Sequence, residues 1–189
     1  MPYERHMSQG SGTLALVLTV SDGVTAGTRE DSSGPIIEER LTGLGFLVER
    51  ALVADEPDQI ARIVADAADR AMRLVVTTGG TGLGPRDRTP EGVARVIDYV
   101  VPGLGEAMRA EGRGHTPLSS LSRSLGAVRG QSLILCLPGS PKGASESLDA
   151  VADILVHALE TLAGRTGHGA AHDDTTTGHA PTEPTEGQA

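Results

Sequence analysis

Residues 74–91 read LVVTTGGTGLGPRDRTPE, a short aliphatic run followed by a glycine-dense turn and a helix start. Leu74 to Thr77 is typical of a buried strand, and Thr89-Pro90-Glu91 is typical of the first turn of a helix. Glycine tolerates positive φ and lets backbone N–H groups come close to a ligand, and two threonines add hydroxyl donors. The stretch therefore predicts a strand, an anion-binding loop suited to phosphate, and a helix, in that order.

The flanking segments continue this alternation of apolar runs and helical patterns. We expect strands at residues 14–20, 46–53, 74–77 and 133–137, and helices at residues 35–41, 57–72, 90–99, 104–110 and 143–162. Strands that lack polar alternation and are separated by helices indicate a sheet covered on both faces. The expected fold is α/β, a three-layer α/β/α sandwich with a mostly parallel sheet.

Ligands of such sheets bind beyond the carboxyl ends of the strands, so the residues that follow each expected strand are the most informative. They are Ser21-Asp22-Gly23, Asp55-Glu56, the glycine loop, and Pro138-Gly139-Ser140-Pro141-Lys142. We expect these segments to meet at one edge of the sheet.

Composition narrows the class of protein. The chain has 189 residues, 38% of them hydrophobic, which suffices for one core, placed at residues 13–163. Residues 1–12 and 164–189 are polar and poor in aliphatic side chains, and both are expected to be flexible. A net charge of −9 and 2% aromatic residues argue against a nucleic-acid partner. No apolar run reaches the roughly 20 residues of a membrane span, and the lone Cys136 is expected in the core, so a cytoplasmic protein is predicted.

Common catalytic motifs are missing from the sequence. It contains no Gly-Lys-Ser/Thr of a P-loop, and no G-x-G-x-x-G that follows a strand and opens a helix. His115 is expected in a loop and His157 on the surface of the last helix, so no Ser–His–Asp or zinc set is indicated. Hydroxyls, glycine N–H groups and carboxylates instead favour phosphoryl or nucleotidyl transfer.

Two aspartates are candidates for that chemistry. Asp87 lies too far before Pro90 to cap the helix if Thr89 is the N-cap, which favours a role at a phosphate or Mg²⁺. Asp55 precedes Glu56-Pro57-Asp58, where an ordinary helix cap is the somewhat better interpretation. Arg86 is either a phosphate ligand or a solvated surface residue, whereas Lys142 favours anion contact.

Several ordered motifs resemble one known family. Val20-Ser21-Asp22, Thr78-Gly79-Gly80-Thr81-Gly82, Pro85-Arg86-Asp87, Thr89-Pro90-Glu91, Leu121-Ser122-Arg123 and Leu137-Pro138-Gly139-Ser140 are similar to those of the MogA/MoaB-like molybdopterin adenylyltransferases. The likeness spans about residues 13–162. Arg88 departs from it, because many relatives carry an aliphatic residue there.

The resemblance implies a reaction in which molybdopterin and Mg-ATP form adenylylated molybdopterin and pyrophosphate. It places Asp55 and Asp87 as the catalytic pair, with Mg²⁺ at Asp87. It assigns Ser21, Asp22, Thr78, Gly79, Gly80, Thr81 and Gly82 to the nucleotide, and Ser122, Arg123, Pro138, Gly139, Ser140 and Lys142 to molybdopterin. It further implies a homotrimer and a MoeA-like molybdenum insertase as partner. The alternative from another functional class is a non-catalytic molybdopterin-binding carrier or assembly protein.

Overall fold

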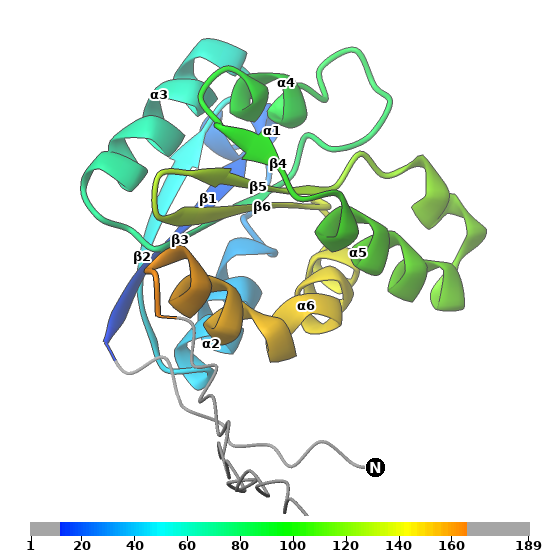
Figure 1. Cartoon of the computed structure of the whole chain (residues 1–189). Helices are drawn as coiled ribbons and strands as arrows, with labels where there is room; N and C mark the ends of the chain where they lie inside the picture. Colours follow the sequence, from blue (N-terminus) through cyan, green and yellow to red (C-terminus); the bar gives the residue numbers. More distant parts are fainter. Residues whose placement is uncertain (1–11, 166–189) are drawn as a thin grey trace, which may run out of the picture.

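The computed structural model describes residues 12–165 and contains one six-stranded sheet with the strand order β2-β1-β3-β6-β5-β4 (Figure 1). The strands are β1 (Thr13–Val20), β2 (Phe46–Val53), β3 (Leu74–Thr78), β4 (Tyr99–Val100), β5 (Leu125–Arg129) and β6 (Ser132–Leu137). The pairs β1/β2, β1/β3 and β3/β6 are parallel, whereas β5/β6 and β4/β5 are antiparallel. The sheet is therefore mixed, with its antiparallel part at one edge.

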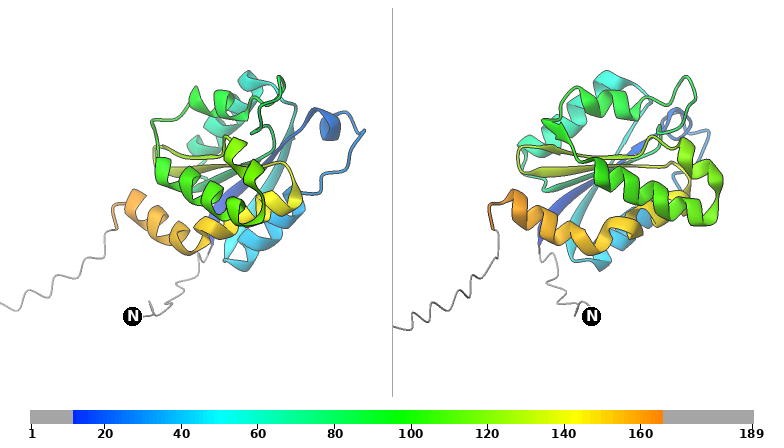
Figure 2. Two further views of the ribbon diagram at one scale, coloured as in Figure 1. Left: turned by 90° about the vertical axis from the view of Figure 1, so that its right-hand side faces the viewer. Right: turned by 45° about the vertical axis from the view of Figure 1, so that its right-hand side comes forward.

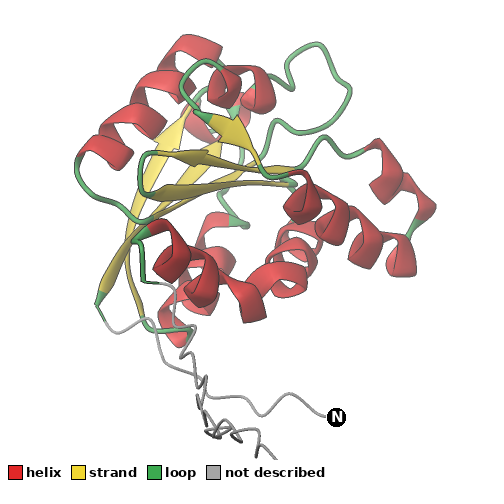
Figure 3. Cartoon of the chain, viewed as in Figure 1, coloured by secondary structure: helices red, strands yellow, loops and turns green. Residues whose placement is uncertain are grey.

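Helices cover both faces of this sheet, as Figure 3 shows. They are α1 (Asp22–Thr25), α2 (Gly34–Gly43), α3 (Pro57–Asp69), α4 (Thr89–Ala94), α5 (Pro102–His115), the 3-10 helix η1 (Pro117–Leu121) and α6 (Pro141–Leu162). One core cluster joins the sheet to α2, α5 and α6, and the other joins it to α3 and the segment of α4 around Val93. The expected three-layer α/β/α arrangement is confirmed.

The core explains why the apolar runs form central strands. Every residue of β3 and β6 is buried, because helices cover both of their faces. Cys136 is fully buried in β6, as expected, and burial raises the pKa of its thiol to about 12. No helix in the described part of the chain is long and apolar enough to span a bilayer.

The antiparallel edge differs from the sequence-based expectation. The helix expected over residues 90–99 ends at Ala94, and Tyr99 begins β4 instead. The cause is β5, which the pattern did not predict: the Asp98 N–H donates to the Val128 carbonyl at 2.8 Å. Gly126 lies inside β5 because a Cβ there would come within 2.4 Å of the Leu104 side chain. A glycine at mid-strand hides such a strand from pattern analysis.

Two helices also have different ends from those expected. α5 runs from Pro102 to His115, so His115 ends a helix rather than lying in a loop. α3 stops at Asp69 and is followed by Ala71 at φ 62°, with Met72 buried. α5 and α6 lie next to each other on one face of the sheet (Figure 2). The terminal segments were predicted to be flexible at residues 1–12 and disordered at residues 164–189. Of these, residues 1–11 and 166–189 lie outside the described residues.

Candidate functional site

The segments that follow the carboxyl ends of β1, β2, β3 and β6 surround one pocket of about 830 Å³. Its other wall comes from α5, η1 and the first turns of α6. Twelve of the residues singled out from the sequence line it: Ser21, Asp55, Thr78, Gly79, Gly80, Thr81, Gly82, Asp87, Ser122, Pro138, Gly139 and Ser140. This volume lies in the upper part of the range usual for small-molecule sites, about 300–1,000 Å³. The convergence expected at one edge of the sheet is therefore present.

The glycine loop after β3 has two residues at positive φ, where glycine is favoured. Gly79 has φ 107° and Gly80 has φ 63°. A Cβ on Gly79 would lie 2.2 Å from the Val20 carbonyl oxygen, and one on Gly80 would lie 2.3 Å from Thr89 Oγ1. Gly79 therefore requires glycine for conformational and steric reasons, and Gly80 requires it chiefly for steric ones.

Thr89 fixes the loop to the start of α4. It is buried, its Oγ1 donates to the Gly79 carbonyl at 2.7 Å, and its N–H donates to the Gly80 carbonyl at 3.0 Å. Thr89 is the first residue of α4 rather than its N-cap, which is Arg88. The hydroxyl therefore braces the loop and does not cap the helix.

Asp87 folds back over the same loop. Its Oδ2 accepts a hydrogen bond from the Gly84 N–H at 2.7 Å. A Cβ on Gly82 or Gly84 would lie 2.8 or 2.7 Å from that oxygen. The two glycines thus leave room for the Asp87 carboxylate beside the loop N–H groups.

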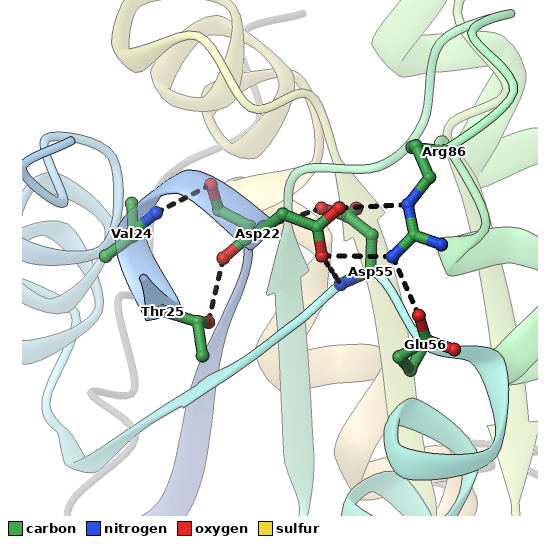
Figure 4. Close-up of polar contacts among 7 residues, drawn as sticks. Asp22, Val24, Thr25, Asp55, Glu56 and Arg86 are labelled. Atoms are coloured by element: carbon green, nitrogen blue, oxygen red, sulfur yellow. Dashed lines mark hydrogen bonds and ion pairs between the residues drawn. The ribbon is translucent and has the colours of Figure 1, made fainter. Parts of the chain in front are cut away.

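Asp55 and Asp22 hold the ends of β2 and β1 together (Figure 4). The Asp22 N–H donates to Asp55 Oδ2 at 2.9 Å, and the Asp55 N–H donates to Asp22 Oδ1 at 3.0 Å. α3 begins at Pro57 and has no side-chain cap, so the helix-cap interpretation of Asp55 is not what the structure contains. Asp55 instead lines the pocket.

The surroundings of these two carboxylates raise the pKa of Asp55 and lower the pKa of Asp22. Burial raises the pKa of Asp55, and the negative charges of Asp22 and Asp87 raise it further, against the hydrogen bond from the Asp22 N–H. The hydrogen bond from Arg86 lowers the pKa of Asp22, with the Asp55 N–H acting in the same direction. Asp55 is therefore the carboxylate whose charged form the site destabilises, a feature common at functional sites.

Arg86 makes ion pairs outside the pocket lining. Its Nε and Nη2 contact the two oxygens of Asp22 at 2.9 and 3.1 Å, and Nη2 also contacts Glu56 Oε1 at 2.7 Å (Figure 4). These bonds raise the pKa of the guanidinium. Arg86 thus ties the segment before α4 to the ends of β1 and β2, and its guanidinium is engaged by carboxylates rather than directed to a phosphate.

Three other predicted site residues also lie outside the lining. Asp22 is held by Arg86, as described above. Arg123 donates to the Gly82 carbonyl at 2.8 Å, to Glu91 Oε1 at 2.5 Å and to the Asp87 carbonyl. It therefore stabilises the glycine loop without lining the pocket. Lys142 has a 77% exposed side chain and contacts Glu146 at 3.7 Å. Their assigned ligand contacts stay predictions.

The pocket includes residues that the sequence analysis did not single out. Asp31 accepts hydrogen bonds from Thr19 Oγ1 and the Gly34 N–H, both at 2.9 Å, and pairs with Arg50 at 2.6 Å. The sequence signal that could have identified Asp31 is its position three residues before Gly34, where α2 begins. The far wall adds further lining residues, among them Arg109, Gly112, Thr116, Leu118, Ser119, Glu146 and Ser147. Only the packing of α5, η1 and α6 brings these together.

The donor set suits Mg²⁺ that is shared with a phosphate ligand. Within residues 12–165 no group of three or more His, Cys, Asp or Glu side chains is placed to hold a metal ion. Mg²⁺ is commonly bound by one or two carboxylates together with substrate phosphates and water. Asp55 and Asp87, which line the pocket beside the loop N–H groups, fit that mode.

Comparison with known proteins gives the family. The model of the family described as "probable molybdopterin binding domain" matches residues 16–159, and the chain belongs to this family. The molybdopterin adenylyltransferase of Escherichia coli is 38% identical over 151 residues, covering 76% of this chain and 77% of that protein. The molybdenum cofactor biosynthesis bifunctional protein of Synechococcus elongatus is 44% identical over 155 residues, and the match covers 82% of this chain but only 49% of that protein.

A solved structure supports the same fold. The molybdopterin biosynthesis enzyme MoaB of Thermus thermophilus superposes with a TM-score of 0.76 at 49% identity, covering 80% of this chain and 97% of that one. The resemblance found in the motifs and the expected fold are both confirmed by these relatives.

Proposed function

We propose that the chain is a molybdopterin adenylyltransferase of molybdenum cofactor biosynthesis, using Mg-ATP. One observation supports this most strongly: the glycine loop, Asp55 and Asp87 line the same pocket as Ser122 and Ser140. Relatives that carry the adenylyltransferase name match most of the described chain. We place the reaction in the cytoplasm, where ATP is available.

The reaction transfers an adenylyl group. A terminal phosphate oxygen of molybdopterin attacks the α-phosphorus of ATP, the bond from that phosphorus to the bridging oxygen breaks, and pyrophosphate leaves with the electron pair. Mg²⁺, when bound, offsets negative charge on the phosphates. Enzymes of this kind act mainly by positioning and electrostatic stabilisation.

The chain supplies the positioning groups. The loop N–H groups and the Thr81 hydroxyl would hold the nucleotide phosphates, and Asp55 and Asp87 would hold Mg²⁺ beside them. The Thr78 hydroxyl donates to the Pro138 carbonyl at 2.8 Å, so it joins the two loops instead of binding a phosphate. Ser140 caps α6 by accepting from the Gly143 N–H at 3.2 Å. The N-terminus of this long helix favours an anion, which suits the phosphate of molybdopterin next to Gly139 and Ser140.

Assembly belongs to the same proposal. Homotrimer formation and hand-over of the product to a MoeA-like molybdenum insertase follow from the family resemblance. Size-exclusion chromatography with light scattering would test the trimer, and co-purification with the insertase would test the partner.

The direct test is pyrophosphate release by the purified chain incubated with molybdopterin and Mg-ATP. The proposal predicts pyrophosphate and adenylylated molybdopterin in equal amounts, and neither product when any one component is omitted. A non-catalytic carrier would bind molybdopterin and release no pyrophosphate, and that result would overturn the assignment.

A further inference from the structure

Glu146 is an acidic side chain in the far wall of the pocket, away from the phosphate-binding groups. It lies in α6, six residues beyond Ser140, which is about 9 Å along the helix axis. Its side chain is 19% exposed and lines the pocket together with Ser147 and Gly143. The proposed adenylyl transfer gives it no role.

Its contacts within the protein involve one oxygen. Glu146 Oε1 lies 3.4 Å from His115 Nε2 and 3.7 Å from Lys142 Nζ. Among the hydrogen bonds and ion pairs of the described residues, Oε2 has no partner. A half-buried carboxylate with an oxygen left for a ligand is well suited to accept hydrogen bonds from a molecule in the pocket.

The pocket that Glu146 lines also offers aliphatic surface, which suits a flat ring with a polar edge. Leu118 and Leu121 also line the pocket and are 68% and 54% exposed, so they present aliphatic surface. A pterin has such a ring, and its 2-amino group and N3–H form an edge with two adjacent donors. A carboxylate accepts from two parallel donors in the same way as it does from a guanidinium.

We infer that Glu146 recognises the donor edge of the pterin ring and determines the specificity of the pocket for 2-amino-4-oxo pteridines. This inference rests on the proposed function, because it takes molybdopterin as the ligand. Guanine carries the same donor edge, whereas adenine presents a donor next to an acceptor. Glu146 therefore selects the pterin and leaves the adenine of ATP to another part of the pocket.

The experiment compares two ring systems on three proteins. Fluorescence titration gives the Kd of 6-hydroxymethylpterin and of 6-hydroxymethyllumazine, in which a carbonyl replaces the 2-amino group, for wild type, Glu146→Gln and Glu111→Gln. Glu111 also contacts His115 at 3.4 Å but does not line the pocket, so it is the matched control. Molybdopterin, GMP and ATP are titrated on the same proteins.

Wild type and Glu111→Gln are expected to prefer the pterin over the lumazine by about 10- to 100-fold, the range for loss of a charge-assisted pair of hydrogen bonds. Glu146→Gln loses this preference, because its amide group presents a donor toward the ring, and its molybdopterin Kd rises by a similar factor. Its ATP Kd and Tm stay those of wild type.

The inference is overturned if Glu146→Gln keeps the preference, if ATP and pterin binding weaken together, or if only GMP binding changes. It is also overturned if wild type binds neither pterin nor molybdopterin. These outcomes are separate from the pyrophosphate assay: a protein that releases pyrophosphate but discriminates rings independently of Glu146 retains its proposed function and loses only this inference.

Discussion

Asp22 and Asp55 each accept a hydrogen bond from the backbone N–H of the other, at 3.0 and 2.9 Å respectively, across the ends of β1 and β2. This exchange places the Asp55 carboxylate at the pocket although its pKa is raised by burial and by neighbouring acids. The Asp55 carboxylate is thus held in a position that costs stability when it is ionised and that suits a cation. The arrangement links the local geometry to the proposed reaction.

Replacing Asp55 with Asn should raise stability and lower activity. A carboxyl group whose pKa is higher in the folded protein than in the unfolded chain destabilises the fold when it is ionised, so the cost is present at neutral pH and disappears as pH falls through the folded pKa. The Asn Oδ1 can still accept from the Asp22 N–H. We expect a higher Tm than wild type at pH 7 without Mg²⁺, equal Tm values at low pH, and at least a 100-fold loss of pyrophosphate release.

Thermal unfolding at several pH values measures the first effect. A Tm at pH 7 that falls below that of wild type would show that the ionised Asp55 stabilises the fold, contrary to this account.

Replacing Arg86 with Ala should impair catalysis much more than folding. The guanidinium is 57% exposed, and exposed ion pairs add little to stability. It nevertheless fixes the segment that carries Asp87, and small displacements of catalytic groups can reduce rates about 10- to 100-fold. We expect a loss of kcat in this range with Tm within a degree or two of wild type. Arg40→Ala, which removes the surface pair with Asp149, is the control and should change neither.

Replacing Gly79 with Ala tests the backbone requirement of the loop. The added Cβ would meet the Val20 carbonyl, and φ is 107°. Strained backbone and overpacking together cost about 3 kcal/mol or more. Urea denaturation should show this loss, whereas Gly43→Ala, where a Cβ has nothing within 4 Å, should be neutral or slightly stabilising. Equal stability of the two variants would contradict the steric argument.

Asp31 should stabilise the fold in a pH-dependent way. Burial opposes ionisation, but hydrogen bonds from the Gly34 N–H and Thr19 and the pair with Arg50 lower the pKa of Asp31 overall. Its contribution is therefore complete above the ordinary aspartate pKa and disappears as pH falls through the folded pKa. Asp31→Ala should cost about 1–3 kcal/mol at pH 7 by urea denaturation. The difference from wild type should shrink as pH falls below 3.8, the ordinary aspartate pKa, and a constant difference would argue against ionisation as its source.

Much of the fold follows from local sequence. The apolar runs of β1, β3 and β6 predict their strands because helices cover both faces of the central sheet. β2 was also predicted, although it is an edge strand with several exposed residues. β5 was missed because Gly126 weakens its pattern, although packing of Leu104 requires that glycine. The helix predicted over residues 90–99 is too long, because the Asp98 N–H donates to the Val128 carbonyl. That hydrogen bond depends on tertiary structure, which local sequence does not show.

The candidate site was predictable where its parts are contiguous in sequence. The loop glycines and Asp87 are neighbours, so their shared pocket could be expected. Spacing alone favoured a helix cap for Asp55, and this interpretation was wrong, because the partner of Asp55 is Asp22, which lies 33 residues away. Glu146 could not be found, since the face of α6 that lines the pocket is set by packing against α5.

The central claim is that Asp87, beside the glycine loop, serves adenylyl transfer rather than ligand capture. Asp87→Asn should therefore reduce pyrophosphate release from molybdopterin and Mg-ATP to background, while the Kd for molybdopterin stays within about threefold of wild type, which is about 0.65 kcal/mol. Parallel loss of molybdopterin binding, or pyrophosphate release that persists in the variant, would contradict the account.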